Sequence, residues 1–223
     1  MKIVGHRGAR HLAPENTLNA LEIAIKHGVD EIEIDVRVTR DGHVVLHHDP
    51  VVRAKTGETY TISTHTLEEL RAKKSDITTL AAAVNTVKRR VPLMIEVKPR
   101  QPIAPIVSII EAFLADGWEP KDFMFGSFSQ SILRQLHETL PQIELVVIEA
   151  YASFRATYRA RQVGAHKVSI NHRLLWFANV AAMRRKNYEV YTWTLNDPRK
   201  AERLRKSGLS GTITDNPKLY TKD

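Results

Sequence analysis

The stretch EIEIDVRV at residues 31–38 alternates charged side chains with Ile and Val, which is the pattern of a β-strand whose two faces differ. Similar short β-rich runs recur along the chain, and amphipathic helical patterns separate them. The strand-like runs are Lys2–Val4, Glu31–Val38, Leu93–Val97, Phe123–Phe125, Leu145–Ile148, Lys167–Ile170, Val190–Thr194 and Gly211–Thr214. The helical stretches are Thr17–His27, Thr79–Arg89, Ile103–Asp116, Ser129–Leu140, Phe154–Val163, Ala178–Lys186 and Pro198–Ser207.

This alternation predicts an α/β protein with a parallel sheet, because parallel neighbours need long, usually helical connections. Eight strands favour closure into a (β/α)8 TIM barrel. A doubly wound open sheet is the alternative, and it is disfavoured because no glycine-rich dinucleotide loop follows the first strand. We expect one barrel domain over residues 1–223.

The segment between the second and third strands departs from this alternation. An extra strand at His43–His48, a turn at Thr56-Gly57 and a capping box at residues 66–69 predict a small excursion at the C-terminal mouth of the barrel.

The composition is that of an ordinary globular protein with a basic surface. Hydrophobic residues make up 43% and charged residues 26% of the 223 residues, which excludes disordered and fibrous classes. No apolar run approaches the roughly 18 residues of a membrane span, and the absence of cysteine excludes disulfides and thiolate chemistry. The formal net charge of +8 is compatible with nucleic acid, an anionic membrane or an anionic substrate. Because the basic residues are scattered and have no aromatic residues interleaved, we expect a solvated surface and no nucleic-acid partner.

Polar residues gather where the predicted strands end. Glu33 and Asp35 share one face of the second strand, and Glu96 and Lys98 share one face of the third. In a barrel these ends meet at the mouth, where function is placed. Three carboxylates brought together raise one another's pKa unless a cation lies between them, and oxygen ligands without cysteine point to Mg²⁺ or Ca²⁺. The spacing alone favours the alternative, a salt-bridge cluster with Arg7 and Lys98, because such triplets are common.

Two histidines stand beside this polar set. His6 directly follows the first strand and precedes Arg7, and His48 follows the extra strand. Two imidazoles beside Arg7 and Lys98 suit an anionic substrate that needs proton transfer near pH 7. His47 and His48 point to opposite faces of an extended chain, so only one of them is expected in the site.

Nine short motifs follow one another along the chain. They are Gly5-His6-Arg7-Gly8, Pro14-Glu15-Asn16-Thr17, Glu33-Ile34-Asp35-Val36, Thr39-Arg40-Asp41-Gly42, His48-Asp49, Glu96-Val97-Lys98, Ser127-Phe128-Ser129, Thr192-Trp193-Thr194-Leu195-Asn196 and Thr214-Asp215-Asn216-Pro217. In this order they closely resemble the glycerophosphodiester phosphodiesterase family over essentially the whole chain. The resemblance favours a metal site over the salt-bridge cluster. It also favours His48 over His47, because the family's second histidine directly precedes an aspartate.

The resemblance implies a (β/α)8 barrel that hydrolyses glycerophosphodiesters to sn-glycerol 3-phosphate and an alcohol. It implies that Glu33, Asp35 and Glu96 hold a divalent cation and that His6 and His48 form a general acid–base pair. It implies that Arg7 and Lys98 bind the phosphate. It further implies that Glu15 and Asn16 support the first loop and that Trp193 forms a wall of the pocket. For Trp193, simple barrel packing is the alternative. The attacking group is either the substrate's own glycerol hydroxyl, which gives a cyclic phosphate, or water, and the sequence leaves both routes open.

Two other functions stay open. A related barrel phospholipase D, acting on lysophospholipids, needs an apolar rim or an interfacial helix, and the sequence displays neither clearly, although loops such as those of Phe128 and Trp176 can assemble a rim. A non-catalytic basic binding protein would have lost a histidine or a metal carboxylate, and none is lost. We therefore expect a small, water-soluble glycerophosphodiester as the substrate.

Two further expectations concern single positions. Glu31 shares the face of Glu33 but lies deeper, so it is predicted to be a buried acid, with a partner that the sequence does not identify. Very little sequence precedes His6, which leaves no room for a cleavable signal peptide and favours a cytoplasmic location.

Overall fold

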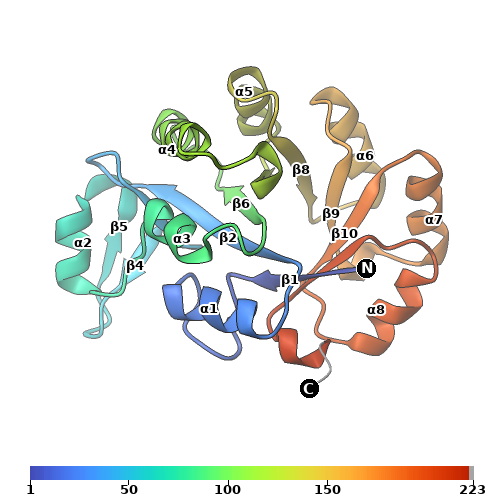
Figure 1. Ribbon diagram of the computed structural model, residues 1–223, viewed down its shortest axis with the longest axis horizontal. Helices are drawn as coiled ribbons and strands as arrows, with labels where there is room; N and C mark the ends of the chain where they lie inside the picture. The colour runs from blue at the N-terminus through green and yellow to red at the C-terminus, as the bar shows by residue number, and fades with distance from the viewer. Residues whose placement is uncertain (221–223) are drawn as a thin grey trace.

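Eight parallel strands close into a barrel in the computed structural model, which describes residues 1–220 (Figure 1). The barrel strands are β1 (Lys2–His6), β2 (Glu31–Val38), β6 (Leu93–Val97), β7 (Phe123–Ser127), β8 (Glu144–Glu149), β9 (Lys167–Asn171), β10 (Glu189–Trp193) and β11 (Gly211–Thr214). The ring closes because β1 pairs with both β2 and β11. The predicted TIM barrel is therefore confirmed, and the strand bounds differ from the predicted ones only at their ends.

Seven helices connect successive strands and surround the barrel (Figure 1). They are α1 (Leu18–Lys26), α3 (Leu80–Val87), α4 (Ala104–Ala115), α5 (Gln130–Thr139), α6 (Ser153–Gln162), α7 (Phe177–Arg185) and α8 (Pro198–Arg205). Single 3-10 turns lie at η2 (Pro120–Asp122), η3 (His172–Leu174) and η4 (Pro217–Leu219). Side chains at four helix starts accept backbone N–H groups that would otherwise lack partners; they are Thr17, Thr79, Ser129 and Asp197. Within residues 1–220, no helix combines the length and apolar character needed to cross a bilayer.

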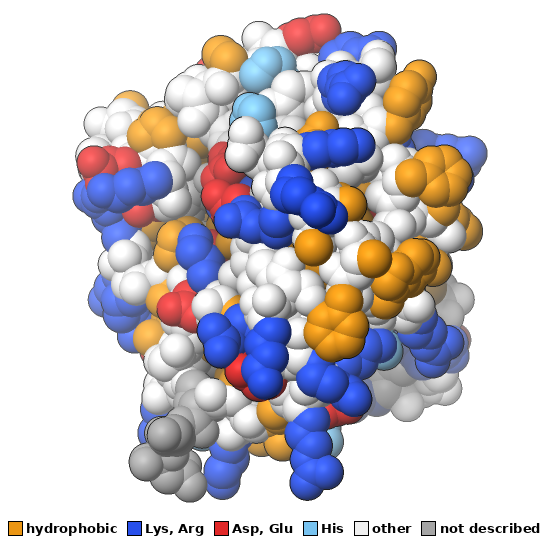
Figure 2. Space-filling model, turned by 90° about the vertical axis from the view of Figure 1, so that its right-hand side faces the viewer, with side chains coloured by type: hydrophobic (Ala, Val, Ile, Leu, Met, Phe, Trp, Pro, Cys, Tyr) orange, Lys and Arg blue, Asp and Glu red, His pale blue; other side chains and the backbone are white. Residues whose placement is uncertain are grey.

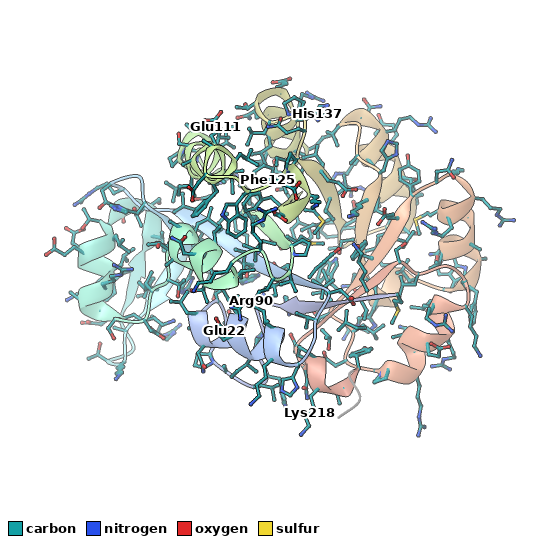
Figure 3. The ribbon with its side chains drawn as sticks, in the orientation of Figure 1. Glu22, Arg90, Glu111, Phe125, His137 and Lys218 are labelled. Atoms are coloured by element: carbon teal, nitrogen blue, oxygen red, sulfur yellow. The ribbon has the colours of Figure 1, made fainter. Side chains whose placement is uncertain are left out.

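Apolar side chains form two layers because residues along a strand face opposite sides of the sheet. The outer layer lies between strands and helices and includes Ile34 and Phe125; Figure 3 shows Phe125 inside the ring of helices and Glu111 outside it. The inner layer fills the barrel with Val4, Met94, Met124, Val146, Tyr191 and Ile213. On the surface, Arg90 donates two hydrogen bonds to Glu22 (3.0 and 2.6 Å) and so joins the turn after α3 to α1 (Figure 3).

The predicted excursion leaves the barrel after β2 and projects beside it, on the left of Figure 1. It contains β3 (Val44–Leu46), β4 (Val51–Arg53), β5 (Thr59–Thr61), η1 (Ile62–Thr64) and α2 (Leu67–Lys73). Its own small core consists of Val45, Val52, Ile62, Leu67, Leu70 and Ile77. The capping box of Thr66 and Glu69 is confirmed at the start of α2.

Two details of the excursion differ from prediction. The extra strand is shorter than His43–His48, because it ends at Leu46, where its pairing with β2 ends. The antiparallel hairpin of β4 and β5 was not predicted, because three-residue strands are too short to show a periodic pattern.

Candidate active site

A cavity of about 310 Å³ opens at the C-terminal ends of the barrel strands. It is lined by His6, Arg7, Arg10, Glu33, His48, Glu96, Phe128, Ile148, Ser169, Trp193, Thr194 and Ile213. Its volume suits a small molecule, and its mixture of charged, histidine and aromatic side chains is typical of a reactive pocket. One side is charged and carries both histidines, whereas Phe128, Ile148 and Ile213 make the other side apolar.

Three carboxylates meet at the charged side. Glu33 and Asp35 come from β2 and Glu96 from β6, and the register pairs Asp35 directly with Glu96. All three are buried, and one ligand atom from each lies within 4.8 Å of the others. Carboxylate oxygens this close together fit a hard divalent cation, because an ion with oxygen ligands at about 2.1–2.5 Å brings its ligands to such separations. One oxygen of Glu33, Oε1, has no hydrogen-bond partner among the described residues, as such a site requires.

The acidity of these groups reflects their crowding. Burial raises the pKa of Glu33 well above its ordinary value, and the charges of Asp35 and Glu96 raise it further. Burial also raises the pKa of Glu96, although Lys98 opposes the shift. Burial opposes the ionisation of Asp35 as well, but the charges of Lys98 and Arg7 outweigh it and hold the pKa of Asp35 below its ordinary value. A divalent cation would relieve the excess of three carboxylates over two cationic side chains.

The two predicted phosphate-binding cations both contact this cluster. Arg7 Nε lies 3.0 Å from Asp35 Oδ2, and the Arg7 backbone N–H donates to Glu33 Oε2 at 3.0 Å. Lys98 Nζ lies 2.5 Å from Asp35 Oδ1 and also contacts Glu96 Oε1. Lys98 is not among the residues that line the cavity, whereas Arg7 is.

A tight loop after β1 places Arg7. Arg7 itself has a left-handed backbone (φ 51°), and the next residue is Gly8 (φ 83°). A Cβ on Gly8 would lie only 2.6 Å from the backbone of Ala20 in α1, so glycine lets the loop rest against that helix. The predicted supports close the loop. Asn16 exchanges hydrogen bonds with the Asp35 side chain and backbone (3.0 and 3.2 Å), and Glu15 accepts from Arg7 Nη1 at 2.7 Å.

Each cavity histidine is held by a carboxylate. His6 Nδ1 lies 2.6 Å from Asp215 Oδ1, and His48 Nδ1 lies 2.8 Å from Asp49 Oδ1. An ionised carboxylate can only accept, so in each pair Nδ1–H donates and Nε2 is left as the reactive nitrogen. Burial lowers the pKa of His6, although the hydrogen bond to Asp215 raises it in part. Burial also lowers the pKa of His48, and the charge of Lys98 adds to this shift.

The structure brings His48 to the cavity and leaves its neighbour outside. His47 lines a separate, smaller cavity, which His48 borders as well; its other lining residues include Glu15, Lys74 and Asp76. The Nδ1 of His47 lies 2.9 Å from the Asp49 carbonyl oxygen. Of the two, only His48 borders the main cavity; both residues lie beyond the end of β3, so the alternation of a regular strand is not the cause.

Trp193 both lines the pocket and packs inside the barrel, the two possibilities that the sequence left open. Its ring lines the cavity, packs edge-on against Phe128 at 5.6 Å between ring centroids, and also packs on the inner apolar layer. Its Nε1 donates to the Ser169 carbonyl at 3.1 Å, so the ring is fixed in place.

Sequence reasoning assigned no role to several residues of this site. Arg10 lines the cavity and lies 3.2 Å from Glu15 and 3.7 Å from Asp215. Asn196 donates to the second oxygen of Asp215 at 2.8 Å. The signal that could have identified Asp215 and Asn196 is that both are polar residues near strand ends and lie inside the quoted motifs. Arg10 lies in an irregular loop, where no spacing rule predicts direction.

The fold gathers exposed aromatic residues that the sequence shows only in separate segments. Five aromatic side chains are strongly exposed, and all come from two segments; they are Tyr151, Phe154, Tyr158, Trp176 and Phe177. The two segments follow the neighbouring strands β8 and β9, so the fold brings together residues that the sequence separates. Exposed rings therefore follow the C-terminal ends of two strands whose ends form part of the mouth.

Fold and site together define a (β/α)8 barrel enzyme with a cluster of carboxylates and two carboxylate-held histidines at its mouth. The family model of the glycerophosphoryl diester phosphodiesterase family matches residues 6–219. A Bacillus subtilis (strain 168) protein, provisionally named a glycerophosphodiester phosphodiesterase, is 29% identical over 100% of this chain and 98% of its own length. The chain belongs to the glycerophosphoryl diester phosphodiesterase family and is an enzyme of that class, a phosphoric diester hydrolase.

Solved structures have the same fold. A glycerophosphodiester phosphodiesterase from Thermotoga maritima superposes with a TM-score of 0.80 at 25% identity, covering 99% of this chain and 96% of that one. A phosphodiesterase from Oleispira antarctica, solved in complex with the product sn-glycerol-3-phosphate, has a TM-score of 0.84 at 24% identity, covering 98% of this chain and 94% of that one.

Proposed function

We propose that this enzyme hydrolyses small glycerophosphodiesters to sn-glycerol 3-phosphate and an alcohol, with a divalent cation, Mg²⁺ or Ca²⁺, held by Glu33, Asp35 and Glu96. The observation that carries the proposal is the buried set of three carboxylates, two of which, Glu33 and Glu96, line a cavity that also holds His6 and His48. The product complex of the Oleispira antarctica phosphodiesterase supports the proposed product class.

The charges of the site suit a phosphodiester, which carries one negative charge that repels nucleophiles. When bound, the divalent cation would polarise a phosphoryl oxygen and offset this charge. Arg7, on the cavity wall, binds a phosphate oxygen, while the loop contacts of Glu15 and Asn16 hold it there. Lys98 keeps Asp35 ionised and supplies the second positive charge beside the phosphate. Trp193 forms the wall against the glycerol.

His6 and His48 act as the general acid–base pair. Each presents Nε2 to the cavity because its Nδ1–H is donated to an aspartate. One imidazole removes the proton of the attacking hydroxyl or water, and the other protonates the leaving alkoxide. Well-placed proton transfer of this kind accelerates a reaction by about 10²–10⁴-fold.

The test is an activity screen over several glycerophosphodiesters with Mg²⁺, Ca²⁺ or a chelator, with released glycerol 3-phosphate as the readout. We expect turnover with at least one cation and its loss with the chelator. Full activity in the chelator would contradict the metal proposal, and no turnover of any diester would contradict the substrate class.

A second candidate is hydrolysis of lysophospholipids. The observation that favours it is the group of exposed aromatic residues in the segments that follow β8 and β9. The test of this candidate is to measure kcat/KM for glycerophosphocholine and for a lysophospholipid below its micelle threshold. We expect an advantage for glycerophosphocholine, because the cavity of about 310 Å³ suits a small head group. A clear advantage for the lysophospholipid would establish the second candidate and leave the metal and histidine roles unchanged.

Three other statements remain predictions of the sequence: the single-domain organisation, the cytoplasmic location and the lack of a nucleic-acid partner.

A further inference from the structure

The exposed aromatic residues lie on a strongly basic part of the chain. Residues 150–187 contain eight Lys and Arg residues and no Asp or Glu, so this stretch alone equals the formal net charge of +8 of the whole chain. Arg159 and Lys167 are buried, whereas the other six are exposed: Arg155, Arg161, Arg173, Arg184, Arg185 and Lys186. Of these six, only Arg155 has a carboxylate within 4 Å in the part of the chain that the structure describes, at 3.8 Å from Glu149.

These cations and the five exposed rings share one side of the molecule, which we call the α6–α7 face. It consists of the six exposed cations together with Tyr151, Phe154, Tyr158, Trp176 and Phe177. Figure 2 shows this side, where hydrophobic side chains interleave with Lys and Arg side chains. The two helices are tied together, since Asn179 Nδ2 donates to Ser153 Oγ at 3.2 Å and Tyr188 OH donates to the Thr157 carbonyl at 3.3 Å. The α6–α7 face is therefore one connected surface.

The rings are far more exposed than aromatic residues usually are. Tyr151 is 77% exposed, Phe154 74% and Trp176 60%. Single exposed apolar residues are ordinary, but a cluster of large rings marks a surface that binds something. Arg155 lies over the Tyr151 ring at 5.7 Å, so cations and rings are mixed at the level of individual side chains.

The α6–α7 face adjoins the mouth of the barrel. The loop before α6 directly follows Ile148 and Glu149, the last two residues of β8, and Ile148 lines the cavity. Arg159 of α6 donates to the carbonyl oxygens of Ile148 (2.9 Å) and Phe128 (2.7 Å), so the helix is fastened to the cavity wall. A flat partner bound to the face would therefore lie beside the opening.

We propose that the α6–α7 face docks on the surface of an anionic lipid bilayer. Trp and Tyr rings favour the boundary between lipid head groups and acyl chains, and Arg side chains reach back from that boundary to lipid phosphates. Unpaired positive charges complement an anionic lipid surface, and their attraction adds to apolar burial. A strand of nucleic acid needs a groove that follows its backbone, whereas these rings lie on α6 and α7 and in the loops before them.

The test measures binding of the full-length protein to vesicles of phosphatidylcholine alone and of phosphatidylcholine with phosphatidylglycerol (3:1), by flotation. We expect at least about tenfold tighter binding to the anionic vesicles, because the cations add to apolar burial only there. The double variant Phe154→Ser, Trp176→Ser should lose at least about tenfold in affinity, and Arg155→Glu, Arg173→Glu should lose the preference for anionic vesicles. The matched control is Leu18→Ser, Leu219→Ser, which removes exposed apolar residues elsewhere and should bind as the unaltered protein does.

A spectroscopic readout locates the contact. The chain has three tryptophans, and Trp176 is the strongly exposed one in the structure. Bromine-labelled anionic lipid should quench the fluorescence of the unaltered protein and not that of Trp176→Phe. Quenching that persists in Trp176→Phe would overturn the proposed orientation.

Three results would overturn the proposal: equal binding to both kinds of vesicle with no loss in the double variant, tighter binding to single-stranded RNA than to vesicles, or a dimer in solution that the double variant dissociates. The binding measurements need no turnover, and neither altered pair lies in the proposed catalytic site. The double variant should hydrolyse glycerophosphocholine at the unaltered rate, so failure of docking and failure of the proposed function are distinguishable.

Discussion

Glu31 and Glu33 lie two residues apart on the same face of β2, and both are buried inside the barrel, yet their surroundings differ. Glu31 accepts from Lys2 Nζ at 2.5 Å and from Tyr191 OH at 3.2 Å, and these contacts identify the partners that the sequence did not. Glu33 has no Lys or Arg side chain within 4 Å among the described residues; it accepts from the Arg7 backbone N–H, lies 3.9 Å from His6 Nε2 and is close to the carboxylates Asp35 and Glu96. Glu31 is thus paired with side chains of the fold, whereas Glu33 is left for a ligand.

The same contrast extends to the neighbouring cations. Around Glu31, Lys167 lies 2.7 Å from Glu144, so acids and bases at the closed end of the barrel are paired. At the mouth, three carboxylates face two cations, and burial lowers the pKa of His6 and of His48 and so favours their neutral forms. A surplus of buried negative charge is costly unless a cation binds, so the mouth, unlike the closed end, carries charge that a ligand can offset.

The largest effect is expected at Glu33. Glu33→Gln keeps the side-chain shape but removes the charge that the proposed cation needs, so kcat should fall at least about 10³-fold while the fold is retained. Isothermal titration with Mg²⁺ and Ca²⁺, together with circular dichroism, checks both parts. Full chelator-resistant activity in this variant would contradict the assignment.

The pH dependence of cation binding sharpens the same point. Burial raises the pKa of Glu33 above its ordinary 4.5. Without metal, protonated Glu33 therefore contributes its full stabilisation at pH values below 4.5. This contribution is lost as the pH rises through the folded-state pKa of Glu33. A divalent cation binds the ionised carboxylate. The Tm increase caused by saturating Mg²⁺ or Ca²⁺ should therefore grow as the pH rises through that folded-state pKa. The increase should be largely absent in Glu33→Gln.

The histidine pair should give the next largest effect. His48→Ala should lower kcat by about 10²-fold or more, because it removes a proton-transfer group from the cavity. His47→Ala is the matched control and should leave kcat nearly unchanged, since His47 lines a different cavity. The reverse order of effects would show that the catalytic residue is His47.

Asp215 tests whether the hydrogen bond to His6 matters for catalysis. Asp215 has a pKa of about 2, since its hydrogen bonds from His6 and Asn196 outweigh burial, so it is ionised throughout the working pH range. Asp215→Asn should lower kcat by about tenfold. It should also move the limb of the pH–rate profile that His6 controls to lower pH, because Asp215 raises the pKa of His6. A loss of kcat with an unshifted profile would indicate a merely structural role.

The smallest effect on turnover is expected at Glu31. Glu31→Gln weakens the contact with Lys2 and Tyr191 at the closed end, so the free energy of unfolding should fall by about 1–3 kcal/mol. Thermal unfolding measures this loss, and the expected kcat is that of the unaltered enzyme. A large loss of kcat with unchanged stability would mean that the two ends of the barrel do not differ as the contacts indicate.

The sequence by itself determined the barrel and most of the site. Eight β-rich runs separated by amphipathic stretches predict a parallel barrel because each pattern depends only on neighbouring residues. The spacing of Glu33 and Asp35 predicts that both share one face of β2 for the same reason, since alternation along a strand is local, whereas Lys98 directly follows the end of β6. The resemblance of the ordered motifs supplied the roles of Glu15 and Asn16, whose loop has no periodic pattern.

Only the tertiary structure decided which distant residues meet. The partners of Glu31 come from the first and tenth strands of the chain, and Asp215 reaches His6 across 209 positions. The α6–α7 face escaped the sequence because its rings lie in two segments that become neighbours only when β8 pairs with β9. Lys98 has the spacing of a phosphate ligand, and only the structure shows that its ammonium group contacts Asp35 and Glu96 and that the residue does not line the cavity. Local pattern determines the direction of a side chain on its own element, whereas its partner depends on how the strands close and how the loops fold over their ends.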